Sequence, residues 1–381
     1  MKKGIELNDL AAEITRQSET KKDYLADSRK VLMAPDTGRL EIDFTEPGAD
    51  IQRVDDFEIR PHAHKQLATH TGIPTKYYDR MPTDLKAVNV NHWLHNEPTN
   101  RMIRTLDGDV RAFMSDSYRP LDNFDLANAV LPILMEQTGM RVESCQLTET
   151  RMYIKAIFPN IESDLDPAVG DIVKAGLEIR NSEVGAGALD FMTIAYRLWC
   201  LNGCTTGVGH KRRHVGKRQG EAETAEEFYR DETRAKDDEA FWMKIQDTVR
   251  ATVTQESFEK IAQRMRDTKQ HELGNPVQVC EIAAKKFGLN ETEQGGILQH
   301  LVSGGDLTGF GLLNAVTRYS QDVDDYDRAS EFERLGGQII ELPSTAWKEF
   351  APVTVTVPGM GDFPAGTDIP GMGTLENGAA A

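Results

Sequence analysis

The stretch RLWCLNGCTTGVGHKRRHVGKRQG, residues 197–220, separates two parts of the chain that differ in their hydrophobic pattern. Before it, helical segments mix with strand-like runs at 141–158 and 172–180, and residues 188–200 read as a strand or a buried helix. After it, apolar residues recur at the helical period of about 3.6 residues. Strands and helices followed by a helical region predict an α+β fold, with a mixed or antiparallel sheet in the N-terminal half.

Short local signals predict a turn and a helix start. Asp107-Gly108 lies between two apolar runs and predicts a hairpin within residues 101–122, because both residue types tolerate the backbone angles of a tight turn. Asn275 before Pro276 predicts the first residue of a helix, since Asn caps the first turn and Pro suits it.

The chain has 381 residues, enough for two domains of about 150 residues or for one elaborated domain. The pattern divides it into an N-terminal arm or helix at 1–25, an α+β core ending in a basic loop at 26–220, a mainly helical region at 221–350, and a tail at 351–381. The tail holds six Gly, four Pro, three acidic residues and no basic one. Such a composition buries too little apolar surface to offset the entropy of ordering, so we expect a disordered tail.

The overall composition limits the class of protein. Hydrophobic residues make up 39% and charged residues 28% of the chain, as in a globular protein. No apolar run approaches the roughly 20 residues that cross a bilayer, and the start lacks the apolar core of a secretion signal. Four cysteines do not form a disulfide framework, so we expect a cytoplasmic protein. The net charge of −17 argues against a surface that is basic throughout, although a local basic stripe is enough to bind phosphate.

Such a stripe lies at residues 210–218, HKRRHVGKR, which we call the basic segment. Its candidate nucleic-acid contacts are Lys211, Arg212, Arg213, His214, Lys217 and Arg218. Glycines around it expose backbone N–H groups beside long cationic side chains, and both bind phosphate oxygens. Residues 221–240 carry nine acidic against three basic residues, so the alternative is that the basic segment pairs with them, in the same subunit or in a neighbouring one.

Two further places combine basic and aromatic residues. Tyr118 and Arg119 follow a predicted polar turn, where an aromatic ring can stack on a base. Arg197 precedes the basic segment and is a candidate helper at the same site. Phe113 and Trp199 are expected in the hydrophobic core instead.

A zinc site is an alternative for the same stretch. Cys200 and Cys204 are spaced C-x3-C, and His210 and His214 follow as H-x3-H. Only five residues separate the two pairs, whereas a zinc finger has about a dozen, so no metal or other cofactor is expected. The three histidines between residues 62 and 70 are expected at the surface or at helix ends.

Catalytic motifs are missing from the sequence. It contains no G-x-S-x-G, no H-E-x-x-H and no Walker A lysine, and GAG at 185–187 lacks the rest of a dinucleotide fingerprint. Scattered carboxylates keep a metal-dependent nuclease as an alternative, but their spacing singles out no pair.

Three segments together resemble a family of proteins. They read GDVRAFMSDSYRPLDNFDLANAV (108–130), FMTIAYRLWCLNGCTTGVGHKRRHVG (191–216) and LTGFGLLNAVTRYSQ (307–321). Over residues 20–330 the chain is similar to an uncharacterised family of phage- and plasmid-borne proteins. The most specific part is Arg-x-x-Cys-x-Asn-Gly followed by Arg-His-x-Gly, which matches Arg197, Cys200, Asn202, Gly203, Arg213, His214 and Gly216. The resemblance implies a mobile element in a bacterial host and no particular reaction.

Together these observations favour a non-catalytic phage-type protein that binds or anneals single-stranded DNA in recombination or replication. We expect it to form homo-oligomers, and its acidic tail is a candidate site for a protein partner. The first alternative is a phage assembly or host-interaction protein that self-associates without DNA. The second is the metal-dependent nuclease.

Overall fold

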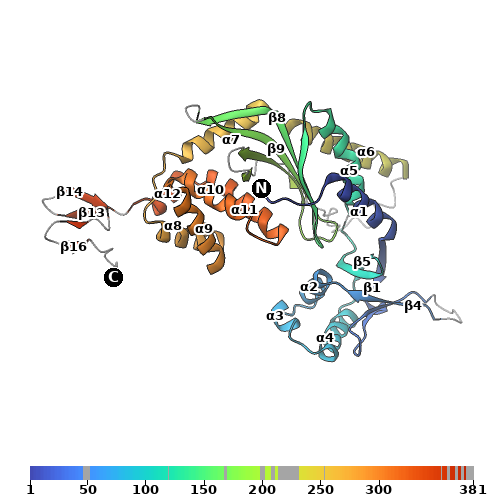
Figure 1. Ribbon diagram of the computed structural model, residues 1–381. Coiled ribbons are helices and arrows are strands. Elements are labelled where there is room, and N and C mark those ends of the chain that lie inside the picture. The colour runs from blue at the N-terminus through green and yellow to red at the C-terminus, as the bar shows by residue number, and fades with distance from the viewer. Residues whose placement is uncertain are drawn as a thin grey trace.

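The computed structural model describes most of the chain, and all structural statements below concern these parts. The structure describes residues 1–45, 52–118, 120–166, 170–197, 202–206, 211–212, 231–252 and 254–352, together with four short strands of the tail. The fold is α+β, as the sequence predicts: sheets and helices fill the N-terminal half, and helices the C-terminal half. Figure 1 shows the arrangement.

The N-terminal unit is a sheet with helices packed on it. Its strand order is β1-β5-β6-β4-β3-β2, and only β4 and β6 pair in parallel among the described strands. These strands are β1 (Lys22–Asp27), β2 (Val31–Met33), β3 (Leu40–Asp43), β4 (Val54–Ile59), β5 (Asn100–Leu106) and β6 (Asp109–Ser115). A 3-10 turn, η1 (Ser28–Lys30), joins β1 to β2, and the helices are α2 (Pro61–His70), α3 (Thr75–Tyr78) and α4 (Thr83–Asn96).

The predicted hairpin at Asp107-Gly108 is confirmed. It joins β5 to β6, and both turn residues have positive φ, 55° at Asp107 and 87° at Gly108. A turn of this kind matches the right-handed twist of the paired strands. The hairpin fixes the register in which Ile103 and Phe113 face the core of the unit, beside Leu67 of α2.

A second, antiparallel sheet forms the centre of the molecule. Its order is β11-β10-β9-β8-β7, and β12 pairs with β10. The strands are β7 (Arg141–Leu147), β8 (Met152–Asp166), β9 (Asp171–Asn181), β10 (Leu189–Arg197), β11 (Asn202–Thr206) and β12 (Lys211–Arg212). Of the two readings of residues 188–200, the strand is therefore correct for Leu189–Arg197.

Alternate side chains of each strand point to opposite faces of the second sheet. The two faces differ in polarity. One face carries an apolar row, with Ile154 and Ile179 packed among the helices α1 (Leu7–Thr20), α5 (Asn123–Glu136) and α6 (Asp231–Thr252). On the other face the fully buried Lys155 donates to Glu333 at 2.6 Å and lies over the Tyr326 ring.

The C-terminal half is a cluster of helices against the edge of the second sheet. They are α7 (Gln255–Thr268), α8 (Pro276–Phe287), α9 (Glu291–Gly304), α10 (Gly309–Tyr319), α11 (Tyr326–Ile340) and α12 (Ser344–Phe350). The predicted helix start is confirmed, since the Asn275 side chain accepts from the Val277 N–H at 2.9 Å. None of the helices in the described ranges is both long and apolar enough to cross a membrane.

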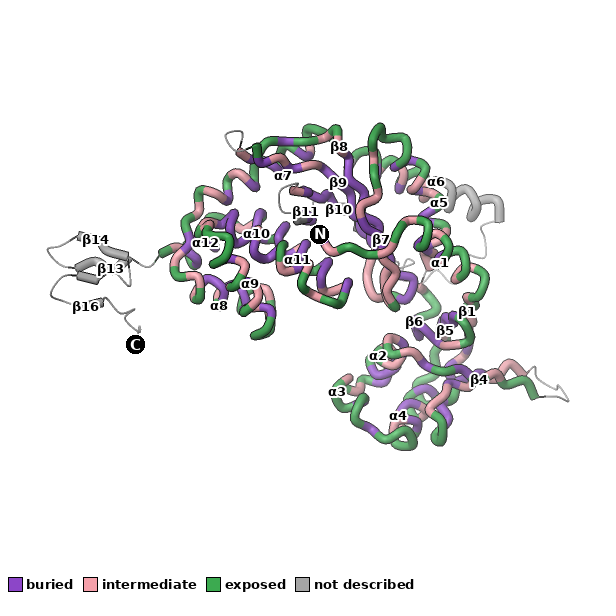
Figure 2. The backbone as a smooth tube through the Cα atoms, viewed as in Figure 1, coloured by how far each residue is buried: buried purple, intermediate pink, exposed green. Residues whose placement is uncertain are grey.

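One feature differs from the simplest reading of the sequence. Residues 26–220, expected as one core, contain two sheets whose buried side chains form separate clusters, and Figure 2 shows the two groups. In the tail, the structure describes two short hairpins, formed by β13 (Thr354–Val357) with β14 (Gly361–Pro364) and by β15 (Asp368–Ile369) with β16 (Gly373–Thr374).

Candidate nucleic-acid interface

The two sheets meet at the loop between β9 and β10, residues 182–188, which we call the junction loop. Its Val184 carbonyl accepts from His62 Nε2 at 2.9 Å and from Gln66 Nε2 at 2.7 Å, and both donors belong to α2. Gly185 has φ +75°, and a Cβ at this position would lie 3.1 Å from Met114 Sδ. The loop therefore needs glycine at the point where it approaches the N-terminal unit.

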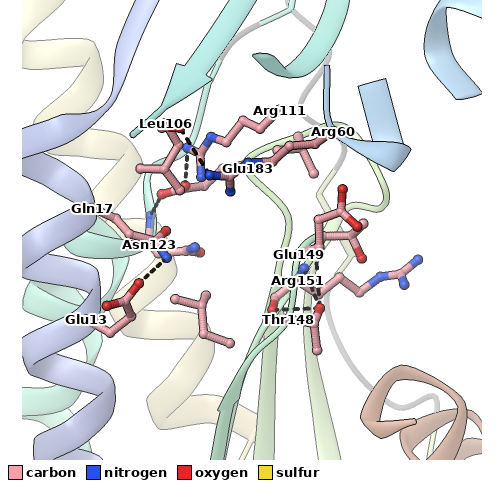
Figure 3. A pocket seen from close by; sticks show the side chains of 13 residues that line it. Glu13, Gln17, Arg60, Leu106, Arg111, Asn123, Thr148, Glu149, Arg151 and Glu183 are labelled. Carbon is pink, nitrogen blue, oxygen red and sulfur yellow. Dashed lines mark hydrogen bonds and ion pairs between the residues drawn. The ribbon is translucent and has the colours of Figure 1, made fainter. Parts of the chain in front are cut away.

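A pocket lies on each side of the junction loop. The first pocket, of about 240 Å³, is drawn in Figure 3 and is lined by Glu13, Gln17, Arg60, Leu106, Arg111, Asn123, Leu147, Thr148, Glu149, Thr150, Arg151, Glu183 and Val184. The second pocket, of about 460 Å³, is lined by Gln66, Thr69, His70, Arg101, Phe113, Met114, Ser115, Tyr118, Gly185, Gly187 and Ala188. The first mixes both charges, whereas no described residue lining the second is acidic.

In the first pocket, each arginine has a carboxylate close by. Arg60 donates to Asp109 at 3.1 Å. The nearly buried Arg111 donates to Glu183 at 2.5 Å, and the other Glu183 oxygen accepts from the Asn123 backbone N–H, also at 2.5 Å. The third, Arg151, donates to the Ala186 carbonyl at 2.6 Å and lies 3.6 Å from an Asp327 oxygen. The protein thus supplies the counter-charges of this pocket itself.

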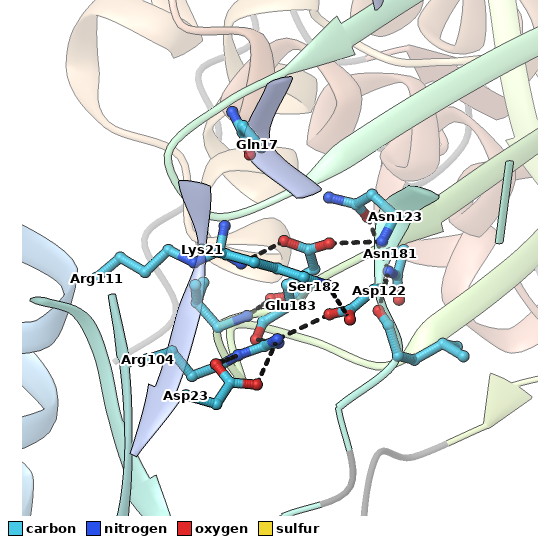
Figure 4. A network of polar contacts seen from close by, with 12 residues as sticks. Gln17, Lys21, Asp23, Arg104, Arg111, Asp122, Asn123, Asn181, Ser182 and Glu183 are labelled. Atoms are coloured by element: carbon cyan, nitrogen blue, oxygen red, sulfur yellow. Dashed lines mark hydrogen bonds and ion pairs between the residues drawn. The ribbon is translucent and has the colours of Figure 1, made fainter. Parts of the chain in front are cut away.

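A buried polar network continues behind the first pocket, and Figure 4 shows its members. Arg104, which is 0% exposed, donates to Asp23 at 2.7 Å, to Asp122 at 2.8 Å and to the Glu183 carbonyl at 2.9 Å. Burial alone would lower the pKa of Arg104, but the hydrogen bonds and charges of Asp23 and Asp122 outweigh it and raise the pKa. Lys21 also pairs with Asp122. This network ties β1 and β5 to the junction loop.

The second pocket holds a guanidinium and an imidazole in contact. Arg101 Nη2 donates to His70 Nδ1 at 2.7 Å, Arg101 Nε donates to Thr99 at 3.0 Å, and the guanidinium lies 5.7 Å from the Phe113 ring centroid. Burial, and after it the charge of Arg101, lower the pKa of His70 to about 4. His70 is therefore neutral near pH 7. The exposed Asp116 acts on Arg101 through its charge but is not among the lining residues.

Of the predicted site residues, Tyr118 lies at the second pocket. Its hydroxyl donates to the Ser182 carbonyl of the junction loop at 3.1 Å, and burial raises its pKa to about 12. Arg197 lines neither pocket: it forms two hydrogen bonds to Asp171, at 2.6 and 2.8 Å, and lies over the Phe310 ring. These contacts connect the second sheet to the C-terminal helices.

Two residues of the basic segment lie in a described strand that pairs with β10. Lys211 and Arg212 form this strand, β12, and the pairing is through the backbone. In the strand register, Lys211 lies opposite Asp190 and Arg212 lies opposite Leu189. Leu189 directly follows Ala188, which lines the second pocket. The other predicted contacts, Arg119, Arg213, His214, Lys217 and Arg218, lie outside the described residues.

His70 and Arg101 are absent from the sequence-based prediction. His70 was grouped with His62 and His64 as residues at the surface or at helix ends, and His62 and His70 do lie in the first and last turns of α2. Each of the three is also partly buried and hydrogen-bonded, His64 to the Tyr78 hydroxyl at 2.9 Å. His70 and Arg101 are 31 residues apart in a helix and a strand, so no local spacing connects them.

The zinc alternative rests mainly on residues that the structure does not describe. Cys200, His210 and His214 lie outside the described ranges, and Cys204 is buried in β11, where burial raises the pKa of its thiol. Within the described ranges, no three side chains of His, Cys, Asp or Glu are grouped so that they could share a metal ion.

Comparison of the chain with protein-family models, with curated proteins and with solved structures finds no match. The resemblance to phage- and plasmid-borne proteins therefore stays a prediction.

Proposed function

We propose that this protein binds single-stranded nucleic acid, with a base in the second pocket and backbone phosphates along the basic segment at 210–218. One observation carries the proposal. The second pocket combines Arg101 and aromatic rings with no acidic residue among the described residues that line it, and Lys211 and Arg212 lie in a strand that pairs with β10 directly after the lining residue Ala188. In keeping with the predicted mobile-element setting, we propose a role in recombination or replication.

The contents of the second pocket suit an unpaired base. Base stacking on an aromatic ring contributes about 1–3 kcal/mol per base and is available to every base type. Tyr118 is a partly exposed ring on the pocket wall, whereas Phe113 is buried and lies beneath Arg101. The guanidinium of Arg101 can donate hydrogen bonds to the edge of the same base. Tyr118 and Arg101 are therefore the proposed base contacts.

The basic segment supplies the phosphate contacts in this proposal. The protein has a net charge of −17, so a polyanion needs a local cationic path to approach it. Each phosphate that the protein neutralises on a single strand steepens the dependence of log K on log salt by about 0.7. If all five Lys and Arg side chains of the segment take part, they contribute a slope of about −3.5.

The test is a salt titration of binding to single- and double-stranded DNA. The variant has Lys211, Arg212, Arg213, Lys217 and Arg218 replaced by Ala. We expect it to lose affinity and to show a flatter salt dependence, because counterion release falls with each lost phosphate contact. The matched control removes the same charge from exposed positions on the C-terminal helices: Lys260, Arg264, Lys285, Lys286 and Lys348. An unchanged slope in the first variant, or the same loss in the control, contradicts the proposal.

Size-exclusion chromatography with light scattering separates the proposal from its first alternative. We expect the oligomeric state or the mass of the complex to change when a single strand is added. If the oligomeric state is the same with and without nucleic acid, the result favours a self-associating protein, in which the basic segment binds the acid-rich residues 221–240 of a neighbour.

A further inference from the structure

The imidazole of His70 holds the guanidinium of Arg101 at the second pocket. Arginine has no acceptor, so in the contact of 2.7 Å the Nδ1 of His70 accepts and Arg101 donates. A neutral imidazole with an accepting Nδ1 carries its proton on Nε2. This Nε2 is buried and has no hydrogen-bond partner among the described residues. Because Nε2 is buried, the donors that a ligand in the pocket can reach are those of the partly exposed Arg101.

Arg101 has further donors. A guanidinium has five N–H groups, and the bonds to Thr99 and His70 use two of them. Both bonds hold the guanidinium in place, over the ring of Phe113. A fixed guanidinium can donate two parallel bonds to a pair of neighbouring acceptors, which a lysine cannot do.

The remaining polar side chains of the pocket are already bonded within the protein. The amide of Gln66 is used at both ends: its oxygen accepts from the Phe113 N–H at 2.7 Å, and its nitrogen donates to Val184. Thr69 donates to a carbonyl of its own helix, at Lys65. Ser115 pairs with Ser117. The pocket therefore offers the remaining donors of Arg101, and its ligand should present acceptors.

Among the bases, guanine matches this arrangement best. Its O6 and N7 are adjacent acceptors, whereas adenine and cytosine place an amino donor on the corresponding edge, and thymine offers one carbonyl beside a methyl group. A bidentate contact from arginine to O6 and N7 is the commonest specific protein–DNA contact. The volume of about 460 Å³ lies within the usual range for ligand sites, about 300–1,000 Å³.

We propose that the second pocket selects a guanine base of the single strand, with Arg101 donating to its O6 and N7 while His70 and Thr99 hold the guanidinium in place. This inference rests on the proposed function and adds a base preference to it. A phosphate group also presents only acceptors, so the experiment must separate a base from the backbone.

The experiment compares binding of three single strands at one salt concentration: a GT repeat, the same repeat with 7-deazaguanine, and an AC repeat. We expect wild-type protein to prefer the GT repeat about tenfold, because a good bidentate contact discriminates to this degree. Replacing N7 of guanine by a C–H group should remove most of the preference.

Two variants assign the preference to the pocket. Arg101→Lys keeps the charge but loses the paired donors, so we expect the preference to disappear while the salt slope stays the same. The matched control is Arg53→Lys, which also changes an arginine lying over a phenylalanine, Phe44 at 5.5 Å, but lies outside the pocket. Thermal unfolding of both variants checks that the fold is retained.

The outcomes distinguish this inference from the proposed function. If the three strands bind equally and with a steep salt dependence, the base preference is wrong and nucleic-acid binding stands. If Arg101→Lys weakens all strands alike, the pocket holds phosphate and not a base, which also overturns the inference. If no strand binds to the wild-type protein, both proposals fail.

Discussion

The two pockets beside the junction loop share a wall but differ in how their cations are satisfied. In the first pocket Arg60, Arg111 and Arg151 each lie within 4 Å of a carboxylate of the same chain. In the second pocket Arg101 is hydrogen-bonded only to neutral partners, His70 and Thr99, in the contacts that the structure gives it.

This difference separates a structural site from a candidate binding site. When a buried cation has its own carboxylate, removing one of the two partners leaves an uncompensated buried charge and destabilises the junction. A cation held by neutral groups keeps its charge available to an anionic or acceptor-rich ligand. We therefore expect changes in the first pocket to alter stability, and changes in the second to alter binding.

The largest expected effect is on stability, from Glu183→Ala in the first pocket. This carboxylate accepts from the buried Arg111 and from the Asn123 N–H, so its loss leaves both donors without this acceptor. We expect the free energy of unfolding to fall by about 3–5 kcal/mol, the cost of breaking a buried ion pair. Urea denaturation measures this loss.

The matched control is Glu149→Ala in the same pocket. Glu149 is exposed and accepts from the His62 backbone N–H at 3.1 Å, so we expect a loss of about 1 kcal/mol. Equal losses in the two variants would show that the buried pair does not stabilise the junction, and the contrast between the pockets would then be lost.

A smaller effect is expected from pH in the second pocket. The pKa of His70 is about 4 in the folded protein, below the ordinary histidine value of 6.5. Between these values the unfolded chain takes up a proton that the folded chain does not, so stability is lost as the pH falls from 7 towards 4. Because the ring is half-buried, we expect this contribution to be about 1–2 kcal/mol.

The variant His70→Gln isolates this contribution. Glutamine stays neutral and can still accept from Arg101, so the variant should lose less stability than the wild type between pH 7 and pH 4.5. Denaturation curves at both pH values measure the difference. Parallel losses in the two proteins would mean that His70 is not held in its neutral form.

Local sequence patterns predicted much of this fold. The Asp107-Gly108 turn, the helix start at Asn275 and the strand nature of 141–158 depend on residues close in sequence, and the structure confirms each. The division of residues 26–220 into two sheets was not predicted. It depends on long-range pairings, such as β4 with β6 across the helices between them, and no local pattern specifies these.

The candidate site was predicted only in part, for a similar reason. Tyr118 was found because it follows a polar turn, and it does line the second pocket. His70 and Arg101 become neighbours only when α2 packs on the first sheet, so their contact has no signature in the sequence. The sequence offered Arg197 as a nucleic-acid contact because it precedes the basic segment. In the structure it forms an ion pair with Asp171 of the neighbouring strand β9.

The smallest expected effect comes from Gly185→Ala, at the wall of the second pocket. Gly72→Ala is a matched control, because both glycines have nearly the same positive φ, +75° and +69°, and no atom of the described residues lies within 4 Å of a Cβ at Gly72. Each substitution should cost about 1 kcal/mol for the backbone conformation. At Gly185 the new methyl group also meets Met114 Sδ at 3.1 Å, so Met114 must shift by a few tenths of an ångström.

That shift decides whether the junction loop controls the second pocket. If Met114 is held firmly, Gly185→Ala costs up to about 1 kcal/mol more than Gly72→Ala and narrows the pocket. Affinity for a single strand should then fall about twofold in Gly185→Ala and stay unchanged in Gly72→Ala. If the two variants have equal stability but unequal affinity for a single strand, the substitution at Gly185 changes the shape of the pocket without a cost in stability. If both stability and affinity are equal, the junction loop does not contribute to the binding surface.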